Sequence, residues 1–201
     1  VYYQDKELWR WCLTEQGFSI PDAKNHVAPI SNFFDRVTAG NLPSFSYLEP
    51  AWMSAHLTNN GNSYHPPSDV CPGELFLKQL YDALTANPDL WRKTLLIISF
   101  DEHGGTYDHI APPWGAAPPW GDQTPPVKLE HGFKFNRYGV RVPTLMISPW
   151  VEEGVVFRSP IDAPFDHTSL IATILTWKGI DPKTAGMGER VARAPTFESV
   201  L

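Results

Sequence analysis

The chain has 201 residues, of which 42% are hydrophobic and 13% aromatic, and its formal net charge is −6. This composition excludes a disordered chain, because there is enough apolar material to bury, and the length suits one domain. The acidic charge without any Lys/Arg run excludes general binding to a nucleic acid backbone, and no apolar run reaches the ~20 residues needed to span a bilayer.

The first part of the chain predicts short elements separated by turns. The segment 30–37 has the pattern of a short helix that Gly40 ends. Residues 45–48 predict a short strand, which Pro50 terminates. These elements are too short to indicate a fold by themselves.

A long irregular segment and a helix come next. Residues 51–72 are rich in Asn, Gly, Pro and His and have no periodicity, so we expect a loop. A loop of this length inside a compact domain is usually functional. Apolar residues at helical spacing from Gly73 to Ala86 predict a helix, which the pair Asn87-Pro88 ends.

Two apolar runs, 94–100 and 142–148, predict buried strands. Each run is almost continuously apolar, as expected for a strand covered on both faces. A Pro/Trp/Gly-rich insertion, residues 111–139, separates them. A helix follows over 168–177, with Asp166, Thr168 or Ser169 as its cap. This order predicts an α/β fold, with a mixed or parallel sheet, flanking helices and right-handed crossovers.

The two cysteines, Cys12 and Cys71, have no close pairing of the kind used in zinc or redox sites. They form either one disulfide in an oxidising compartment or two buried thiols. The thiols are favoured, because nothing in the spacing argues for a bridge.

Two acidic residues, Asp101 and Glu102, follow the first apolar strand directly. In an open α/β sheet, ligands gather beyond the carboxyl ends of the strands. Two adjacent carboxylates that both stay ionised require a cation. Oxygen ligands favour Mg, Ca or Mn, and a nearby imidazole also admits Zn or Fe. The alternative is a surface loop with a solvated Glu, but the buried strand and the following Gly104-Gly105 favour a metal site.

The segment from Asp101 to Pro113 resembles the Asp-Glu-X-Gly-Gly-X-Tyr-Asp-His segment of the bacterial phospholipase C and acid phosphatase family. That family belongs with the alkaline-phosphatase-like enzymes. The resemblance spans roughly residues 30 to 177. Its later landmarks are Gly139-Val140-Arg141-Val142-Pro143, Ile147-Ser148-Pro149-Trp150 and Asp166-His167-Thr168-Ser169.

The resemblance implies an alkaline-phosphatase-like fold and metal-dependent hydrolysis of a phosphoester or phospholipid. It makes Asp101 and Glu102 metal ligands. It also implies that His65 faces the phosphoryl group, where an imidazole neutralises phosphate oxygens or protonates the leaving oxygen. The alternative for His65 is a loop histidine bonded to a backbone carbonyl. His167, as a base or ligand, and His103 are further catalytic candidates.

The remaining histidines carry weaker expectations. We expect Asp108 and His109 to tie the loop together through an Asp–imidazole hydrogen bond. His26, His56 and His131 have no supporting context and are interpreted as ordinary surface or packing residues.

The family's early Glu-Asn pair and its Ser/Thr nucleophile have no counterpart in residues 1–201. Phosphoryl transfer needs such a nucleophile. We therefore expect this chain to be the C-terminal part of one phosphoesterase domain, inactive alone, whose partner is the N-terminal part of the same enzyme. The family also implies a secreted or periplasmic location.

Two other functions remain open. One is a sulfatase- or nuclease-type hydrolase on the same scaffold. The other is a catalytically inactive relative that uses the 111–139 insertion to hold a ligand or partner. Trp114 and Trp120 in this insertion are expected to pack onto the domain, although an aromatic wall would also suit a choline headgroup.

Overall fold

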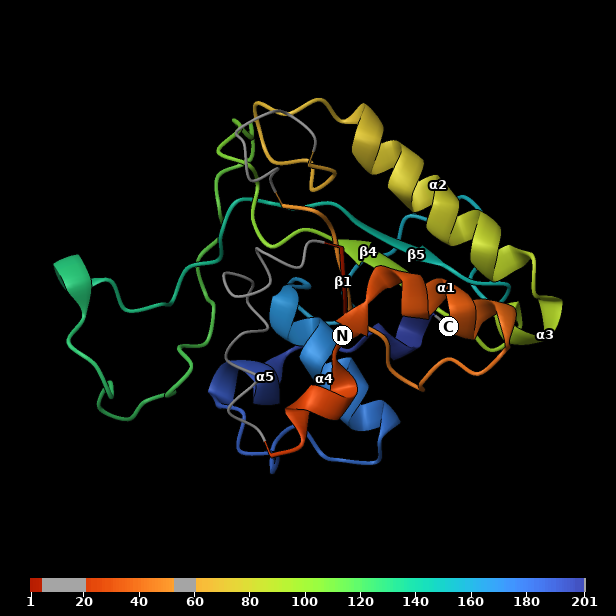
Figure 1. Ribbon diagram of the computed structural model, residues 1–201. Coiled ribbons are helices and arrows are strands. Elements are labelled where there is room, and N and C mark those ends of the chain that lie inside the picture. Colours follow the sequence, from red (N-terminus) through yellow and green to blue (C-terminus); the bar gives the residue numbers. More distant parts are fainter. Residues whose placement is uncertain (5–20, 53–60, 201) are drawn as a thin grey trace. The chain divides into compact units, whose positions relative to one another are not determined.

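The computed structural model describes residues 1–4, 21–52 and 61–200 (Figure 1). The chain divides into two compact units, Val1–Leu95 and Leu96–Leu201. Each unit has its own small sheet, and the two are described separately.

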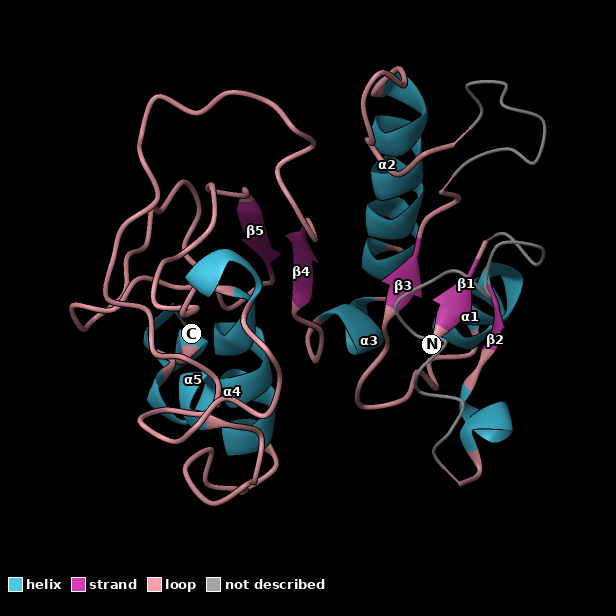
Figure 2. Ribbon diagram, turned by 90° about the vertical axis from the view of Figure 1, so that its left-hand side faces the viewer, coloured by secondary structure: helices cyan, strands magenta, loops and turns pink. Residues whose placement is uncertain are grey.

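The first unit contains a three-stranded parallel sheet in the order β2-β1-β3 (Figure 2). Its strands are β1 (Tyr2–Tyr3), β2 (Ala28–Pro29) and β3 (Leu48–Glu49). The predicted strand 45–48 therefore overlaps β3 at Leu48 only. β1 and β2 were not predicted, because two-residue strands leave no alternating pattern in the sequence.

Helix α1 (Ile30–Thr38) packs against this sheet. It buries Phe33 and Val37, which lie four residues apart and so share one helix face. The Phe33 ring meets the Tyr2 ring edge to face, with 5.5 Å between the ring centres. The helix predicted over 30–37 is confirmed.

Helix α2 (Cys71–Thr85) buries Phe76, Leu80 and Leu84 along one stripe, as the predicted helix over 73–86 requires. A further helix, α3 (Pro88–Trp91), was not predicted. It begins at Pro88, where the sequence indicated the end of the preceding helix. The Asn87 side chain accepts a hydrogen bond from the Leu90 amide and caps this extra turn. A 3-10 turn, η3 (Ala23–His26), completes the unit.

The second unit is built on an antiparallel pair, β4 (Leu96–Ser99) and β5 (Thr144–Ile147). Both predicted apolar strands are therefore confirmed with shorter bounds. Because the two strands are antiparallel, no right-handed crossover joins them, and this part of the predicted topology is wrong. The prediction that both faces of these strands are covered is also wrong, since Leu145 of β5 is 56% exposed. A continuous apolar run does not by itself distinguish parallel from antiparallel pairing.

Helices complete the second unit: α4 (His167–Trp177), α5 (Glu189–Arg193) and the 3-10 turns η4 (Glu130–Gly132) and η5 (Phe197–Val200). The helix predicted over 168–177 is confirmed as α4, which buries Ala172 completely. Val191 of α5 and Phe197 of η5 are also buried. The fold is thus a mixture of helices and small sheets, as expected for the α/β class.

The segment 111–139 leaves the sheet as a long loop with η4 at its far end (Figure 1). Its base is closed by an isolated bridge between Trp114 and Arg137 and by the Tyr138 amide donating to the Pro113 carbonyl at 3.0 Å. Trp120 packs against Phe135 of the same loop, with 5.4 Å between ring centres. Trp114 is 67% exposed under the Arg137 guanidinium, so the packing expected for it is wrong.

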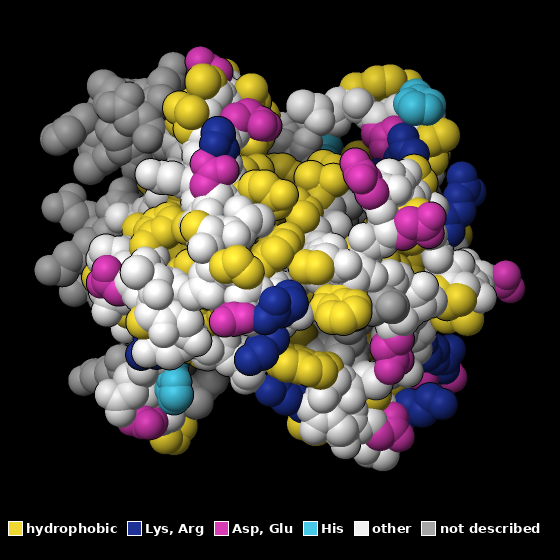
Figure 3. All heavy atoms as spheres, turned by 90° about the vertical axis from the view of Figure 1, so that its right-hand side faces the viewer, with side chains coloured by type: hydrophobic (Ala, Val, Ile, Leu, Met, Phe, Trp, Pro, Cys, Tyr) yellow, Lys and Arg dark blue, Asp and Glu magenta, His cyan; other side chains and the backbone are white. Residues whose placement is uncertain are grey.

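Cys71 is exposed with a free thiol at the start of α2, so the burial expected for it is wrong. Cys12 lies outside the described residues. Among the described residues, no helix is long and apolar enough to cross a bilayer. On the face shown in Figure 3, acidic and basic side chains are interspersed.

Candidate functional site

The two candidate metal ligands lie in the turn that follows β4. Asp101 and Glu102 are both exposed. One carboxylate oxygen of each is engaged locally: Asp101 accepts from the Glu102 amide at 3.1 Å, and Glu102 accepts from the Gly104 amide at 2.7 Å. These bonds hold the two acidic side chains in a defined turn that faces solvent.

The Gly-Gly pair in this turn has a conformational cause. Gly104 and Gly105 have φ angles of 70° and 71°, in the left-handed region that costs most residues energy and glycine little. No atom lies within 4 Å of where a Cβ on Gly105 would be. The backbone angle, not a lack of space, therefore favours glycine at position 105.

His167, the first residue of α4, lies at the same end of β4. Its Nε2 lies 2.6 Å from the carbonyl oxygen of Phe100, the residue before Asp101. A carbonyl oxygen only accepts hydrogen bonds, so Nε2 donates, and Nδ1 of the neutral ring keeps its lone pair. This bond brings His167 to the residue before Asp101, although 67 residues separate the partners in sequence.

His103 is the third candidate in this cluster. Its Nδ1 lies 3.7 Å from Oε2 of Glu102, and its side chain is 35% exposed. The structure thus brings Asp101, Glu102, His103 and His167 to one end of β4. Among the described residues, no group of three or more His, Cys, Asp or Glu side chains is placed to hold a metal ion. The donor types, two carboxylates and an imidazole with a free lone pair, nevertheless fit a divalent cation that takes further ligands.

Asp166 is the N-cap of α4, the helix that begins at His167. Its side chain accepts from the amide and hydroxyl of Thr168, while the Ser169 hydroxyl accepts from the Asp166 amide at 3.1 Å. Together these bonds form a capping box. Asp166 is therefore the cap among the three candidates, and Thr168 and Ser169 lie in the first turn.

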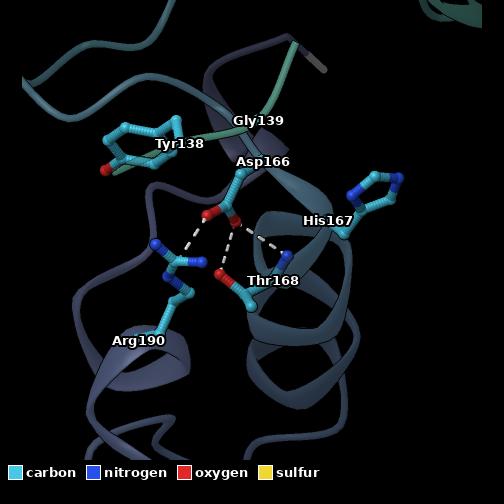
Figure 4. A pocket seen from close by; sticks show the side chains of 6 residues that line it. All are labelled: Tyr138, Gly139, Asp166, His167, Thr168 and Arg190. Carbon is cyan, nitrogen blue, oxygen red and sulfur yellow. Dashed lines mark hydrogen bonds and ion pairs between the residues drawn. The ribbon is translucent and has the colours of Figure 1, made fainter. Parts of the chain in front are cut away.

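A small cavity lies beside this cap. Its lining residues are Tyr138, Gly139, Asp166, His167, Thr168 and Arg190 (Figure 4). Nε of Arg190 is 3.9 Å from Oδ2 of Asp166. Burial, and secondarily the charge of Asp166, raises the pKa of Tyr138. In Figure 4 the His167 ring points away from Asp166 and Arg190.

Replacing Asp166 by alanine is expected to destabilise the protein by about 1 kcal/mol, the usual cost of losing an N-cap. The reason is that the Thr168 amide loses its acceptor. Urea unfolding of the two proteins measures the difference. Asp166→Asn keeps an accepting oxygen and should retain most of the stability. Equal stability of wild type and Asp166→Ala would contradict the capping role.

The loop after the two acids is tied down by an ion pair that the sequence did not predict. Arg141 donates to both oxygens of Asp108, at 2.8 and 2.7 Å, and the Ile110 amide adds a third bond at 3.0 Å. The Arg141 guanidinium and this amide hold the pKa of Asp108 well below its usual range. The hydrogen bonds to Asp108 in turn raise the pKa of Arg141.

The hydrogen bond expected between Asp108 and His109 is wrong. Nδ1 of His109 is 3.7 Å from the nearer Asp108 oxygen, too far for a hydrogen bond. Arg141 takes this place because its planar fork matches both carboxylate oxygens at once. The available signal was Arg141 itself, an isolated cation just before the second apolar strand.

His65 belongs to the first unit and is exposed. Its Nδ1 lies 2.7 Å from the Pro66 carbonyl oxygen, so Nδ1 donates and Nε2 of the neutral ring keeps its lone pair. This bond to a backbone carbonyl is the one that the alternative interpretation of His65 expected. It also leaves the other nitrogen available, so a role toward phosphate stays a prediction.

The turn carrying His65 is braced by its neighbour Tyr64. Tyr64 has a φ of 64°, and its hydroxyl donates to Glu74 at 2.7 Å. Burial and this hydrogen bond raise the pKa of Tyr64 to about 12. The ring covers Gly73 so closely that a Cβ there would lie 2.2 Å from it. His65 is therefore presented by a turn anchored on α2.

The other histidines have the surroundings of ordinary residues where the structure describes them. His26 is exposed, 4.0 Å from Asp22, and His131 is exposed in η4. His56 lies outside the described residues.

Comparison with known proteins gives a consistent result. The sequence model of the Phosphoesterase family matches residues 10–180. Non-specific phospholipase C5 of Arabidopsis thaliana is 40% identical over 167 residues, which cover 81% of this chain and 30% of that protein. Non-hemolytic phospholipase C of Pseudomonas aeruginosa is 39% identical over 149 residues, which cover 67% of this chain and 20% of that protein.

The hemolytic phospholipase C of Pseudomonas aeruginosa is 35% identical over 173 residues, covering 84% of this chain and 20% of that protein. The chain thus spans at most about 30% of the length of these relatives. The family match covers most of the chain, including both candidate carboxylates and all three candidate histidines. The family resemblance seen in the sequence is therefore confirmed, and this chain belongs to the phosphoesterase family.

Proposed function

We propose that the protein containing this chain hydrolyses phosphoester bonds in the manner of a phospholipase C or acid phosphatase. The observation that carries the proposal is the cluster at the end of β4. There two exposed acids follow Phe100, whose carbonyl oxygen accepts a hydrogen bond from the His167 imidazole. Several relatives of the chain are named phospholipases C.

Asp101 and Glu102 would hold a divalent cation in part, with His167 beside them offering Nδ1. When bound, such a cation polarises a phosphoryl oxygen and neutralises developing charge. The donor set admits Ca, Mg, Mn, Zn or Fe. The two acids contribute negative charge that attracts the cation, and their backbone bonds keep the carboxylates from reorienting.

The histidines have distinct proposed roles. In its protonated form, His65 carries a proton on Nε2 that it gives to the leaving oxygen, and the positive charge of that form neutralises the phosphate oxygens. His103, whose Nδ1 lies 3.7 Å from Oε2 of Glu102, is a further catalytic candidate. The nucleophile is a Ser or Thr outside this chain, supplied by an N-terminal part of the same alkaline-phosphatase-like domain. Export to a secreted or periplasmic location belongs to the same proposal.

Two alternatives remain. A sulfatase- or nuclease-type activity uses similar residues, but the net charge of −6 gives no general attraction to nucleic acid. A catalytically inactive relative would keep the fold and bind a ligand without turning it over.

The test is a substrate panel on the full-length protein: phosphatidylcholine, nitrophenyl phosphate, nitrophenyl sulfate and DNA, with each divalent metal and with a chelator. We expect hydrolysis of phosphatidylcholine or nitrophenyl phosphate only, abolished by the chelator and restored by metal. Cleavage of the sulfate ester would favour the sulfatase-type alternative, and cleavage of DNA would favour the nuclease-type alternative. An absence of turnover under every metal would favour the inactive relative.

A further inference from the structure

The far end of the 111–139 loop exposes apolar side chains. We call residues 127–135, which include η4, the tip. Val127 is 61% exposed, Phe133 44% and Phe135 40%. Other large apolar side chains of this chain are exposed as much or more, so the exposure of any one of them indicates nothing by itself. Side chains of this kind gathered at the end of an extended loop indicate an interaction surface.

The aromatic rings of the tip are held in fixed positions. Phe133 and Phe135 lie 4.9 Å apart between ring centres, and Trp120 supports Phe135 from the loop behind it. Phe135 has a φ of 55°, in the left-handed region that a bulky residue rarely adopts. The ring contacts of Phe135 with Trp120 and Phe133 therefore hold Phe133 in position.

The charge of the tip is opposite to that of the chain. The tip carries Lys128 and Lys134 but only one acid, Glu130, whereas the whole chain has a net charge of −6. Lys128 and Lys134 are exposed and flank the exposed apolar side chains. Apolar and aromatic side chains surrounded by cations fit the interface of a bilayer that contains anionic lipids.

We propose that the tip docks on a phospholipid surface, with Val127 and Phe133 entering the headgroup region and Lys128 and Lys134 facing anionic lipids. Docking would bring a lipid-cleaving site to its substrate, so the biological purpose rests on the proposed function. The binding itself does not depend on catalysis. Phe135 and Trp120 form the support beneath the contact rather than the contact itself.

The test is sedimentation of the full-length protein with phosphatidylcholine vesicles, with and without phosphatidylserine. Wild type should bind both and bind the anionic vesicles more tightly. The double variant Val127→Ser/Phe133→Ser and the charge reversal Lys128→Glu/Lys134→Glu should each weaken binding to the anionic vesicles by about tenfold or more. Val156→Ser, which changes an 88% exposed valine outside the tip, is the matched control and should bind like wild type.

Turnover of soluble nitrophenyl phosphate separates this inference from the proposed function. Equal turnover in wild type and both tip variants, with weakened vesicle binding, would support docking. Wild-type protein that sediments with neither vesicle would overturn it, as would tip variants that bind as tightly as wild type. If no variant turns over any substrate, the vesicle data still decide the docking proposal, and only the proposed function fails.

Discussion

Replacing Asp101 by asparagine, or Glu102 by glutamine, is expected to lower kcat/KM for phosphoester hydrolysis by about a hundredfold or more. The basis is that a metal ligand contributes several kcal/mol of transition-state stabilisation, and each 1.36 kcal/mol corresponds to about tenfold in rate. Both substitutions are nearly isosteric. Each removes one negative charge from the end of β4.

These two substitutions isolate charge from loop geometry. In Asp101→Asn, the carboxamide oxygen can still accept the hydrogen bond from the Glu102 amide. In Glu102→Gln, it can still accept the hydrogen bond from the Gly104 amide. The turn should therefore persist while its attraction for a cation falls. A loss of activity with an unchanged melting temperature would then point to the missing charge rather than to a collapsed loop.

Steady-state kinetics and calorimetric titration with metal should be measured on the same full-length proteins. Glu153→Gln and Asp162→Asn are matched controls, because they neutralise exposed acids elsewhere in the second unit. Full activity and unchanged metal affinity in both Asp101→Asn and Glu102→Gln would remove the metal site proposed here. Equal losses in the two controls would instead indicate a general effect of net charge.

The helices of this protein were predictable because their signals are local. Phe33 and Val37 in α1, like Phe76 and Leu80 in α2, are four residues apart and mark a buried face within the segment itself. The strand β4 was predictable for the same reason, since its apolar run is continuous. The position of Asp101 and Glu102 at its end followed directly.

Contacts between distant segments were not predictable from the residues alone. β1 pairs with β2 and β3 across long stretches of chain, using two residues in each strand. The antiparallel register of β4 and β5 likewise depends on how the 111–139 loop returns. Asp108 is an example: His109 is next to it in sequence, but its partner is Arg141, 33 residues away. Proximity in sequence therefore favoured the wrong partner.

Removing Arg141 is expected to lower activity about 10- to 100-fold, the usual cost of losing a residue that orients active-site groups without contacting the substrate. Arg141 binds both oxygens of Asp108 and so ties the loop that carries Asp101 and Glu102 to the segment before β5. Without it, that loop should sample more orientations. Arg141→Lys keeps the charge but not the two-pronged contact, so it should recover only part of the activity.

A double-mutant cycle distinguishes this positioning role from independent effects. Asp108→Asn, Arg141→Ala and the double variant should show losses that are not additive, because each single change breaks the same pair. Additive losses would mean that the two residues act separately. Arg158→Ala is the control, an exposed arginine in the same unit without a role in the cluster.

Stability against pH provides an independent test of the same pair. The pKa of Asp108 is depressed in the folded protein relative to its unfolded value of about 3.9. The pair therefore stabilises the fold fully above the unfolded pKa, and this contribution falls as the pH drops toward the folded pKa. Wild type should be more stable than Arg141→Ala in urea at pH 7, and the difference should shrink progressively below about pH 4. A difference that stayed constant down to pH 2 would show that Arg141 stabilises the fold by some other contact.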